Sequence, residues 1–162
     1  MRQISEYVPI MFRSTLPSMT IFLMLVSVAP LSAASRQIDG PVVAEVVKVI
    51  DGDTVLVEAM PWPDHKVSTY VRLRGIDAPE LKSKCAAFRE AALKAKSELT
   101  SLVNGRVTVQ LTAISGDKYF GRVVADLTLA DGSRPADRLL AAGLAEPYAG
   151  KQKAKRVCPR GL

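Results

Sequence analysis

Short runs of apolar residues, separated by turns rich in glycine and proline, make up most of the chain after residue 40. Residues 41–50 are β-branched and apolar on nearly both faces, which is typical of a strand in a closed or heavily covered sheet. The turn signal at 51–52 separates this run from the next, so the two predict a hairpin. Three later runs alternate apolar and polar residues. The five expected strands are residues 41–50, 54–59, 66–76, 106–112 and 122–129.

Elsewhere the pattern is not that of a strand. Between residues 85 and 103 the apolar positions recur at spacings of three and four, which predicts an amphipathic helix, and the Asn-Gly pair at 104–105 supplies its stop. A short helix is expected over 135–142, with Gly143 at its end. Residues 60–65 contain two prolines and are expected to form a loop rather than part of a central strand.

This order of elements predicts an α+β fold, a β-barrel with helices. The best fit is a five-stranded Greek-key barrel of the OB type, with the long helix between the third and fourth strands and the short helix after the fifth. A split sheet with the helix on one side is the alternative. The segment from about residue 149 is basic and poor in apolar residues, so it is expected to be extended unless Cys158 ties it down.

The first 34 residues have the composition of a secretory signal peptide. Basic residues precede an apolar run at 19–29, and small residues follow near a possible cleavage site. The run is shorter than the roughly 20 residues of a membrane span, although an uncleaved anchor is the competing interpretation. We therefore expect residues 1–34 to be a signal peptide and residues 35–162 to form one exported domain, periplasmic or secreted and without stable membrane insertion after cleavage.

The net charge favours an anionic partner. Removing Arg2, Arg13 and Glu6 with the signal peptide changes the formal charge from +6 to +5. For an exported basic domain, nucleic acid is the first candidate partner, acidic envelope polymers the second and membrane surfaces the third.

The two cysteines both lie in the expected exported domain. An oxidising compartment favours a disulfide between Cys85 and Cys158, while two free thiols are the alternative. A zinc site is not indicated, because two distant cysteines and His65 do not form a recognisable set of ligands.

Carboxylates gather around two turns of this basic chain. Asp51 and Asp53 flank Gly52, and Asp77 and Glu80 follow the third expected strand. Carboxylates and carbonyls are the ligands of hard cations, and an additional carboxylate could activate water beside an arginine that stabilises phosphoryl charge. Each residue alone has a simpler explanation, since turns select Asp and Gly anyway.

Three segments together are similar to the staphylococcal-nuclease-like, or thermonuclease, family. They are Val-Ile-Asp-Gly-Asp-Thr-Val at 49–55, Val-Arg-Leu-Arg-Gly-Ile-Asp-Ala-Pro-Glu at 71–80 and Asp-Lys-Tyr-Phe-Gly-Arg at 117–122. They occur in the family's order and spacing, except that Phe120 is inserted in the third. The resemblance extends from about Val42 to Tyr148.

The resemblance implies a role for each matching position. The implied calcium ligands are Asp53, Asp77 and the backbone carbonyl of Ala78, with Asp51 as a nearby acid outside the direct ligand set. The implied catalytic residues are Glu80 as general base and the phosphate-binding pair Arg72 and Arg122. The implied nucleotide contacts are Lys118 and Tyr119, with Tyr148 as a further candidate for the nucleotide pocket.

The function that the resemblance implies is a calcium-dependent nuclease. Such an enzyme would be an endonuclease hydrolysing DNA and RNA with little sequence preference, leaving 3′-phosphates, and we expect a monomer. The alternative is a non-catalytic OB-type module that binds nucleic acid or another anionic polymer, since a fold does not fix an activity. Carboxylates that face a phosphate favour the enzyme, because they weaken nucleic-acid binding unless a cation covers them.

Overall fold

The computed structural model describes residues 37–103, 105, 107–151, 153 and 157–159. The expected signal peptide at 1–34 lies outside the described residues, as do Asn104 of the expected helix stop and Arg106 of the fourth expected strand. None of the helices among the described residues is long and apolar enough to cross a membrane.

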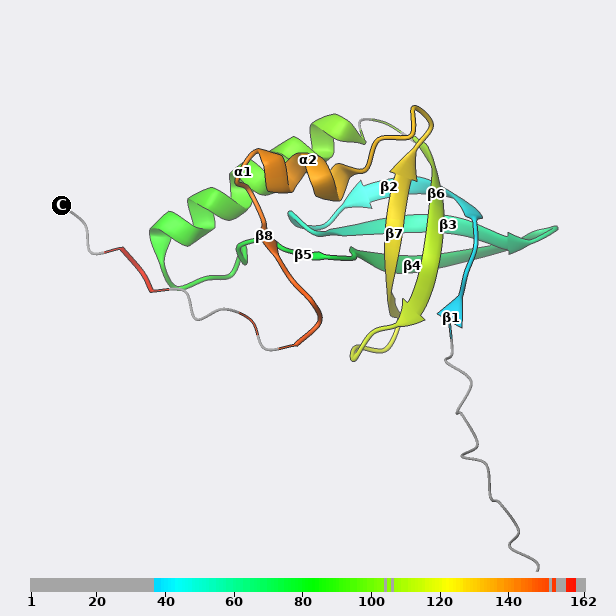
Figure 1. The fold of residues 1–162 in the computed structure, drawn as a ribbon, viewed down its shortest axis with the longest axis horizontal. Helices are drawn as coiled ribbons and strands as arrows, with labels where there is room; N and C mark the ends of the chain where they lie inside the picture. Colours follow the sequence, from blue (N-terminus) through cyan, green and yellow to red (C-terminus); the bar gives the residue numbers. More distant parts are fainter. Residues whose placement is uncertain (1–36, 104, 106, 152, 154–156, 160–162) are drawn as a thin grey trace, which may run out of the picture. The chain divides into compact units, whose positions relative to one another are not determined.

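Five long strands form a closed barrel (Figure 1). Neighbouring strands pair in the order β6-β2-β3-β4-β7, and a further pairing of β6 with β7 closes the circle. All of these pairings are antiparallel except that of β4 with β7. The barrel strands are β2 (Val42–Val49), β3 (Thr54–Trp62), β4 (His65–Leu73), β6 (Thr108–Gly116) and β7 (Arg122–Leu129). The predicted five-stranded barrel with two helices is confirmed.

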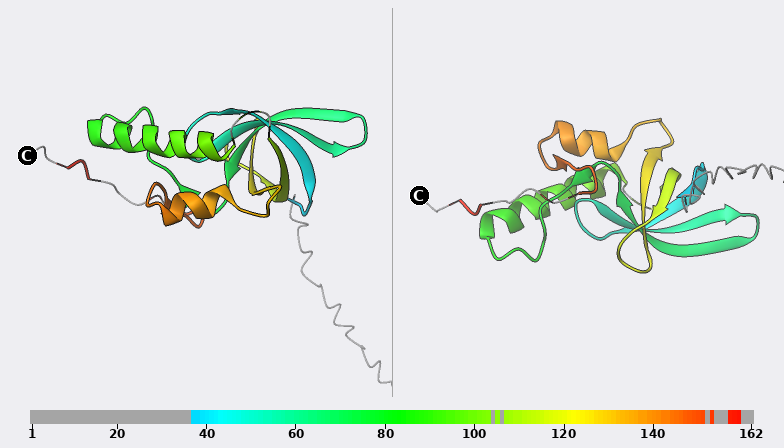
Figure 2. Two further views of the ribbon diagram at one scale, coloured as in Figure 1. Left: turned by 90° about the horizontal axis from the view of Figure 1, so that it is seen from above. Right: turned by 60° about the horizontal axis from the view of Figure 1, so that its bottom comes forward.

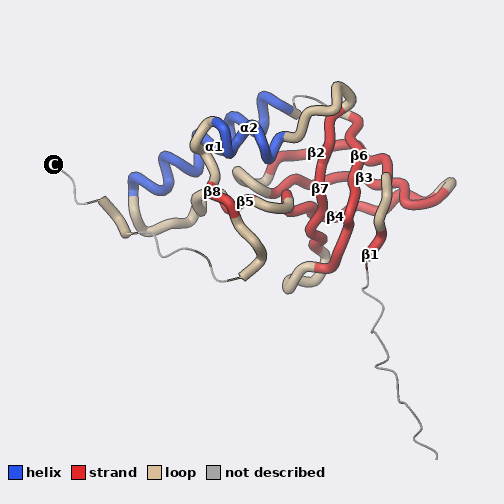
Figure 3. The backbone as a smooth tube through the Cα atoms, viewed as in Figure 1, coloured by secondary structure: helices blue, strands red, loops and turns tan. Residues whose placement is uncertain are grey.

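Three two-residue strands and two helices complete the fold. Figure 3 distinguishes them by secondary structure. They are β1 (Gln37–Ile38), β5 (Ile76–Asp77), β8 (Glu146–Pro147), α1 (Ala86–Leu102) and α2 (Pro135–Ala141). β1 pairs with β6, and β5 pairs with β8. The second pairing brings the residues after α2 next to the turn that follows β4.

The inner faces of the strands supply the core, and α1 adds to it. Ala92, Ala95 and Leu99 are buried along one stripe of α1, as the spacing of three and four predicts. Ala95 and Leu99 belong to the same buried cluster as valines of the barrel such as Val55 and Val57, which are fully buried. Apolar burial on this scale is the main favourable term in folding.

The β3–β4 hairpin is longer than the sequence predicts. Residues 60–65 were expected to form a loop, but Met60 to Trp62 continue β3 and His65 begins β4. Figure 2 shows the hairpin extending from the barrel on the side away from α1. Pro61 is tolerated there because the pairing shifts register between Ala59 and Trp62, and such irregular positions do not need its missing N–H.

The predicted disulfide is present. Cys85, directly before α1, is bonded to Cys158, so the chain after β8 returns to the start of the helix. The two cysteines are 73 residues apart in the sequence, and the loop between them contains α1, β6, β7, α2 and β8.

Replacing both cysteines with serine is expected to lower the free energy of unfolding by about 2–4 kcal/mol, because the crosslink restricts the unfolded chain over a long loop. Urea denaturation of the oxidised protein and of the double variant measures the difference. The wild-type protein in a reducing buffer is the matched control and should unfold like the variant. Equal midpoints for oxidised wild type and variant would contradict the expectation.

Candidate active site

The turn between β2 and β3 is fixed by its own hydrogen bonds. The Asp51 Oδ1 atom accepts a hydrogen bond from the Asp53 backbone N–H at 3.1 Å. The Asp53 carbonyl in turn accepts from the Leu73 N–H at 2.8 Å. The carboxylate of Asp51 thus shapes the turn, and the turn is joined to the end of β4.

Gly52 lets this turn pack tightly under α1. A Cβ atom at this position would lie 2.6 Å from the Cβ of Ala95 and 2.8 Å from the Cβ of Ala78. Both distances are far below a normal contact distance. Only glycine therefore fits without movement of α1 or of the turn that carries Ala78.

Gly52→Ala is therefore expected to destabilise the protein by about 1–3 kcal/mol, the usual cost of overpacking. It should also weaken the site by displacing Asp53. Gly116→Ala is the matched control, because a Cβ there has no atom within 4 Å. Thermal unfolding of both variants tests this, and equal losses of stability would argue against the packing explanation.

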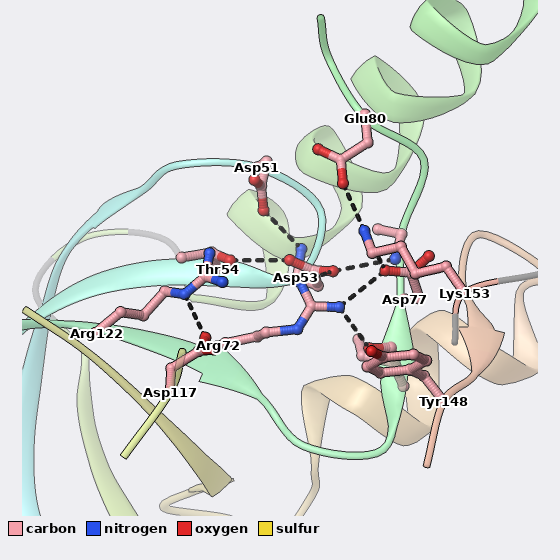
Figure 4. A network of polar contacts seen from close by, with 12 residues as sticks. Asp51, Asp53, Thr54, Arg72, Asp77, Glu80, Asp117, Arg122, Tyr148 and Lys153 are labelled. Atoms are coloured by element: carbon pink, nitrogen blue, oxygen red, sulfur yellow. Dashed lines mark hydrogen bonds and ion pairs between the residues drawn. The ribbon is translucent and has the colours of Figure 1, made fainter. Parts of the chain in front are cut away.

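Arg72 lies between two carboxylates that come from different turns (Figure 4). Its Nη1 atom is 2.8 Å from Asp53 Oδ2, and its Nη2 atom is 2.8 Å from Asp77 Oδ1. Nη2 also donates to the Ile76 carbonyl at 3.2 Å. All three charged residues are buried, although the alternation along β4 placed Arg72 on its polar face. One guanidinium thus holds the two acidic turns together.

Asp53 receives further hydrogen bonds. Its Oδ1 accepts from the Thr54 hydroxyl at 2.8 Å, and its Oδ2 accepts from the Ala78 N–H at 3.2 Å. Burial raises the pKa of Asp53 to about 6, and the nearby Arg72 charge opposes this rise. The buried carboxylates of Asp53 and Asp77 share the Arg72 guanidinium, and positive charge near them favours their ionised forms.

Tyr148 is brought to the same place by the pairing of β5 with β8. Its N–H donates to the Gly75 carbonyl at 2.8 Å. The Arg72 Cζ atom lies 5.5 Å from the centre of the Tyr148 ring, within the range of a cation–π contact. Tyr148, which the sequence offered as a candidate for the nucleotide pocket, therefore lies beside Arg72.

A second arginine, Arg122, is the first residue of β7, directly after the turn from β6. Arg122 Nε is 2.5 Å from Asp117 Oδ2, and its Cζ atom lies 4.6 Å from the centre of the Tyr119 ring. The ammonium of Lys118 lies 4.9 Å from the same ring. The inserted Phe120, next to Tyr119, is fully exposed. Asp117 belongs to the third motif, but no role was predicted for it. The available signal was an acid five residues before the arginine, across a tight turn.

The two arginines line one cleft of about 890 Å³. Side chains from distant parts of the chain meet along its walls. They include Asp51, Arg72, Glu80, Lys118, Tyr119, Arg122, Tyr148 and Lys153. The buried ligand candidates Asp53 and Asp77 contact Arg72 but do not line this cleft; Asp77 lines a second cleft, which shares Glu80 and Lys153 with the first.

Lys153 also lines this cleft, and the sequence predicted no role for it. Its Nζ atom is 2.8 Å from Asp77 Oδ1 and 2.6 Å from Glu80 Oε1. Burial lowers the pKa of Lys153, but the hydrogen bonds to Asp77 and Glu80 outweigh it, so the pKa lies above its ordinary value. No signal in the sequence marked this lysine among the other basic residues of the tail.

A comparison with protein families shows to which family this chain belongs. The model of the family described as staphylococcal nuclease homologue matches residues 70–158, more than half of the 162-residue chain. The chain belongs to the staphylococcal nuclease family. No match was found among curated proteins.

The staphylococcal nuclease match covers part of the site directly. Residues 70–158 include Arg72, Asp77, Glu80 and Arg122. The turn that carries Asp53 precedes the match, but Arg72 binds its carboxylate. Membership of this family supports a nuclease-type function at the level of the family.

The oxygen atoms around Arg72 suit the calcium ion on which staphylococcal nucleases generally depend. Asp53 and Asp77 offer hard carboxylate oxygens, and the oxygen of Asp77 already accepts from two cationic groups, Arg72 and Lys153. In the described part of the chain, no three acidic, histidine or cysteine side chains gather as a metal-binding group. A complete shell would therefore also need backbone carbonyl and water oxygens, which calcium accepts.

Proposed function

We propose that this protein is an exported, calcium-dependent endonuclease that hydrolyses phosphodiester bonds of DNA and RNA with little sequence preference and leaves 3′-phosphates. The observation that carries the proposal is that Arg72, one of two arginines lining the cleft, contacts two buried carboxylates, while a further acid, Glu80, lines the cleft itself. Arginines at fixed positions suit a phosphate, while the carboxylates would repel it unless a cation lies between them.

The proposed roles follow from the position of each side chain. Asp53, Asp77 and the carbonyl of Ala78 would hold the cation, and Asp51 would maintain the turn that presents Asp53. A bound calcium ion would supply charge stabilisation at a phosphate oxygen. Arg72 and Arg122 would bind the phosphate from two sides of the cleft and stabilise the charge that develops in the transition state.

Glu80 is the proposed general base. Its side chain is 62% exposed, so water reaches it, and its Oε1 is 2.6 Å from the Lys153 ammonium at the edge of the cleft. A carboxylate in this position would orient the attacking water and take its proton. Lys118, Tyr119 and Tyr148 would contact the nucleotide, the aromatic rings offering faces on which a base can stack.

The proposed export rests on the signal-like sequence at 1–34 and agrees with the disulfide, since disulfides persist in oxidising compartments. We also propose that the enzyme acts as a monomer.

Product analysis tests the function. The purified protein is incubated in calcium with a single-stranded DNA and with an RNA of the same sequence, and the fragments are weighed by mass spectrometry. We expect fragments ending in 3′-phosphates from both substrates. Recovery of intact strands bound to the protein would instead support the non-catalytic binding module.

A further inference from the structure

The Lys153 ammonium contacts carboxylate oxygens of the kind that a metal ion would bind. Its ammonium bridges Asp77 Oδ1 at 2.8 Å and Glu80 Oε1 at 2.6 Å (Figure 4). Asp77 is buried, and the Lys153 side chain is 41% exposed, so the contact closes over an acidic group from the solvent side. A lysine ammonium carries one positive charge at neutral pH, and it donates to the same kind of oxygen that a hard cation prefers.

Described residues on either side of Lys153 in the sequence are anchored to the rest of the domain. Before it, the Tyr148 hydroxyl donates to the Lys151 carbonyl at 2.6 Å, and the Tyr148 N–H donates to Gly75 at 2.8 Å. After it, Cys158 is bonded to Cys85, which is buried at the start of α1. A segment attached at both ends keeps its side chains at a high effective concentration near the site.

The two contacts have a thermodynamic consequence. A divalent cation and the Lys153 ammonium both draw on the negative charge of Asp77, and each weakens the binding of the other. Because the ammonium is part of the chain, its effective concentration at the site does not fall when the protein is diluted. The apparent affinity for the cation is then lower than the carboxylates alone would give.

We propose that Lys153 is an internal competitor of the divalent cation at this site, and that the Cys85–Cys158 disulfide holds it there. This inference rests on the proposed function, because it takes Asp77 to be a cation ligand. Lys153 lowers the calcium affinity of the site, so that more calcium is needed to fill it. Because the disulfide holds Lys153 in place, this lower affinity is a property of the oxidised, folded chain.

Isothermal titration of calcium into the nucleic-acid-free protein tests the competition. Lys153→Met keeps most of the length of the side chain and removes its charge, and we expect it to bind calcium about tenfold more tightly than wild type. That factor corresponds to the lower end of the range for charged hydrogen bonds, as suits a partly exposed pair. Lys151→Met is the matched control, because it makes the same change in net charge on the same exposed segment.

The control decides between a local and a general effect. An affinity of Lys153→Met that equals wild type, or a gain no larger than that of Lys151→Met, overturns the proposal, as does the absence of calcium binding in both wild type and Lys153→Met. Circular dichroism of each variant confirms that it is folded.

The role of the disulfide is tested by combining changes. In a Cys85→Ser/Cys158→Ser background, the affinity gain from Lys153→Met should fall to about threefold or less, because an untethered segment holds the ammonium at the carboxylates less of the time. An undiminished tenfold gain would show that the disulfide does not hold Lys153.

Failure of the inference and failure of the proposed function give different results. Wild-type protein that cleaves nucleic acid but binds calcium as Lys153→Met does would leave the nuclease intact and remove the competitor. Tighter calcium binding by Lys153→Met in a protein that cleaves no nucleic acid would support the competitor and overturn the nuclease.

Discussion

Replacing Arg72 with methionine is expected to abolish detectable cleavage and to lower the free energy of unfolding by about 3–5 kcal/mol. The reason is the pair of buried carboxylates that Arg72 contacts at 2.8 Å each. Without the guanidinium, Asp53 and Asp77 are buried with much less compensating charge, and the loss of one partner from such a group is strongly destabilising. Urea denaturation measures the stability, and cleavage of single-stranded DNA in calcium measures the activity.

Arg72→Lys separates the two effects. It keeps the positive charge, so more of the stability should remain, but a single ammonium cannot reproduce the two-pronged contact of a guanidinium with two carboxylates. We expect its cleavage rate to be at least about a hundredfold below wild type, the scale of removing one transition-state donor. An Arg72→Met protein with wild-type stability and activity would mean that the cluster has neither role.

Glu80→Gln is expected to lower the rate of cleavage by about 10²–10⁴, the usual contribution of a general base. The amide has nearly the same shape as the carboxylate but cannot accept the proton of the attacking water. Since the Glu80 side chain is 62% exposed, the free energy of unfolding should change by no more than about 0.5 kcal/mol. Steady-state cleavage assays and thermal unfolding of the same preparation provide both values.

The matched control for Glu80→Gln is Glu90→Gln. Glu90 lies on the exposed side of α1, where it pairs with Lys94, and it makes the same change in charge outside the cleft. Its cleavage rate should equal that of wild type. A Glu80→Gln protein that cleaves as fast as Glu90→Gln would rule out Glu80 as the base.

Local sequence patterns predicted most of the barrel because they reflect local physical preferences. The apolar stripe of α1 was visible as a spacing of three and four, and Ala92, Ala95 and Leu99 are buried as that spacing requires. The extension of the β3–β4 hairpin was not predictable in the same way. Pro61 argued against a strand, and a shift in pairing register that no single segment reveals made it acceptable.

The site was only partly predictable. Motifs named Asp53, Arg72 and Asp77, but the alternation along β4 did not reveal that Arg72 is buried between the other two. That arrangement depends on how two distant turns meet. Lys153 was beyond prediction, because its place depends on the disulfide and on the pairing of β5 with β8, both of which join residues far apart in the sequence.

The buried charge of Asp53 opposes stability. Burial raises the pKa of Asp53 to about 6, which means that the folded protein holds a carboxylate where its charge is unfavourable. A chain selected for stability alone would place an apolar residue there. The retention of this cluster next to a cleft with two arginines is the physical argument for a catalytic use.

Calcium dependence of cleavage tests the central claim most directly. A 5′-labelled single-stranded DNA is incubated with the purified protein in calcium or in excess chelator, beside the Glu80→Gln variant. The proposed site predicts cleavage by wild type in calcium, none in chelator, and a rate for Glu80→Gln in calcium at least about a hundredfold below wild type. Cleavage that is equally fast in chelator and in the Glu80→Gln variant would contradict it.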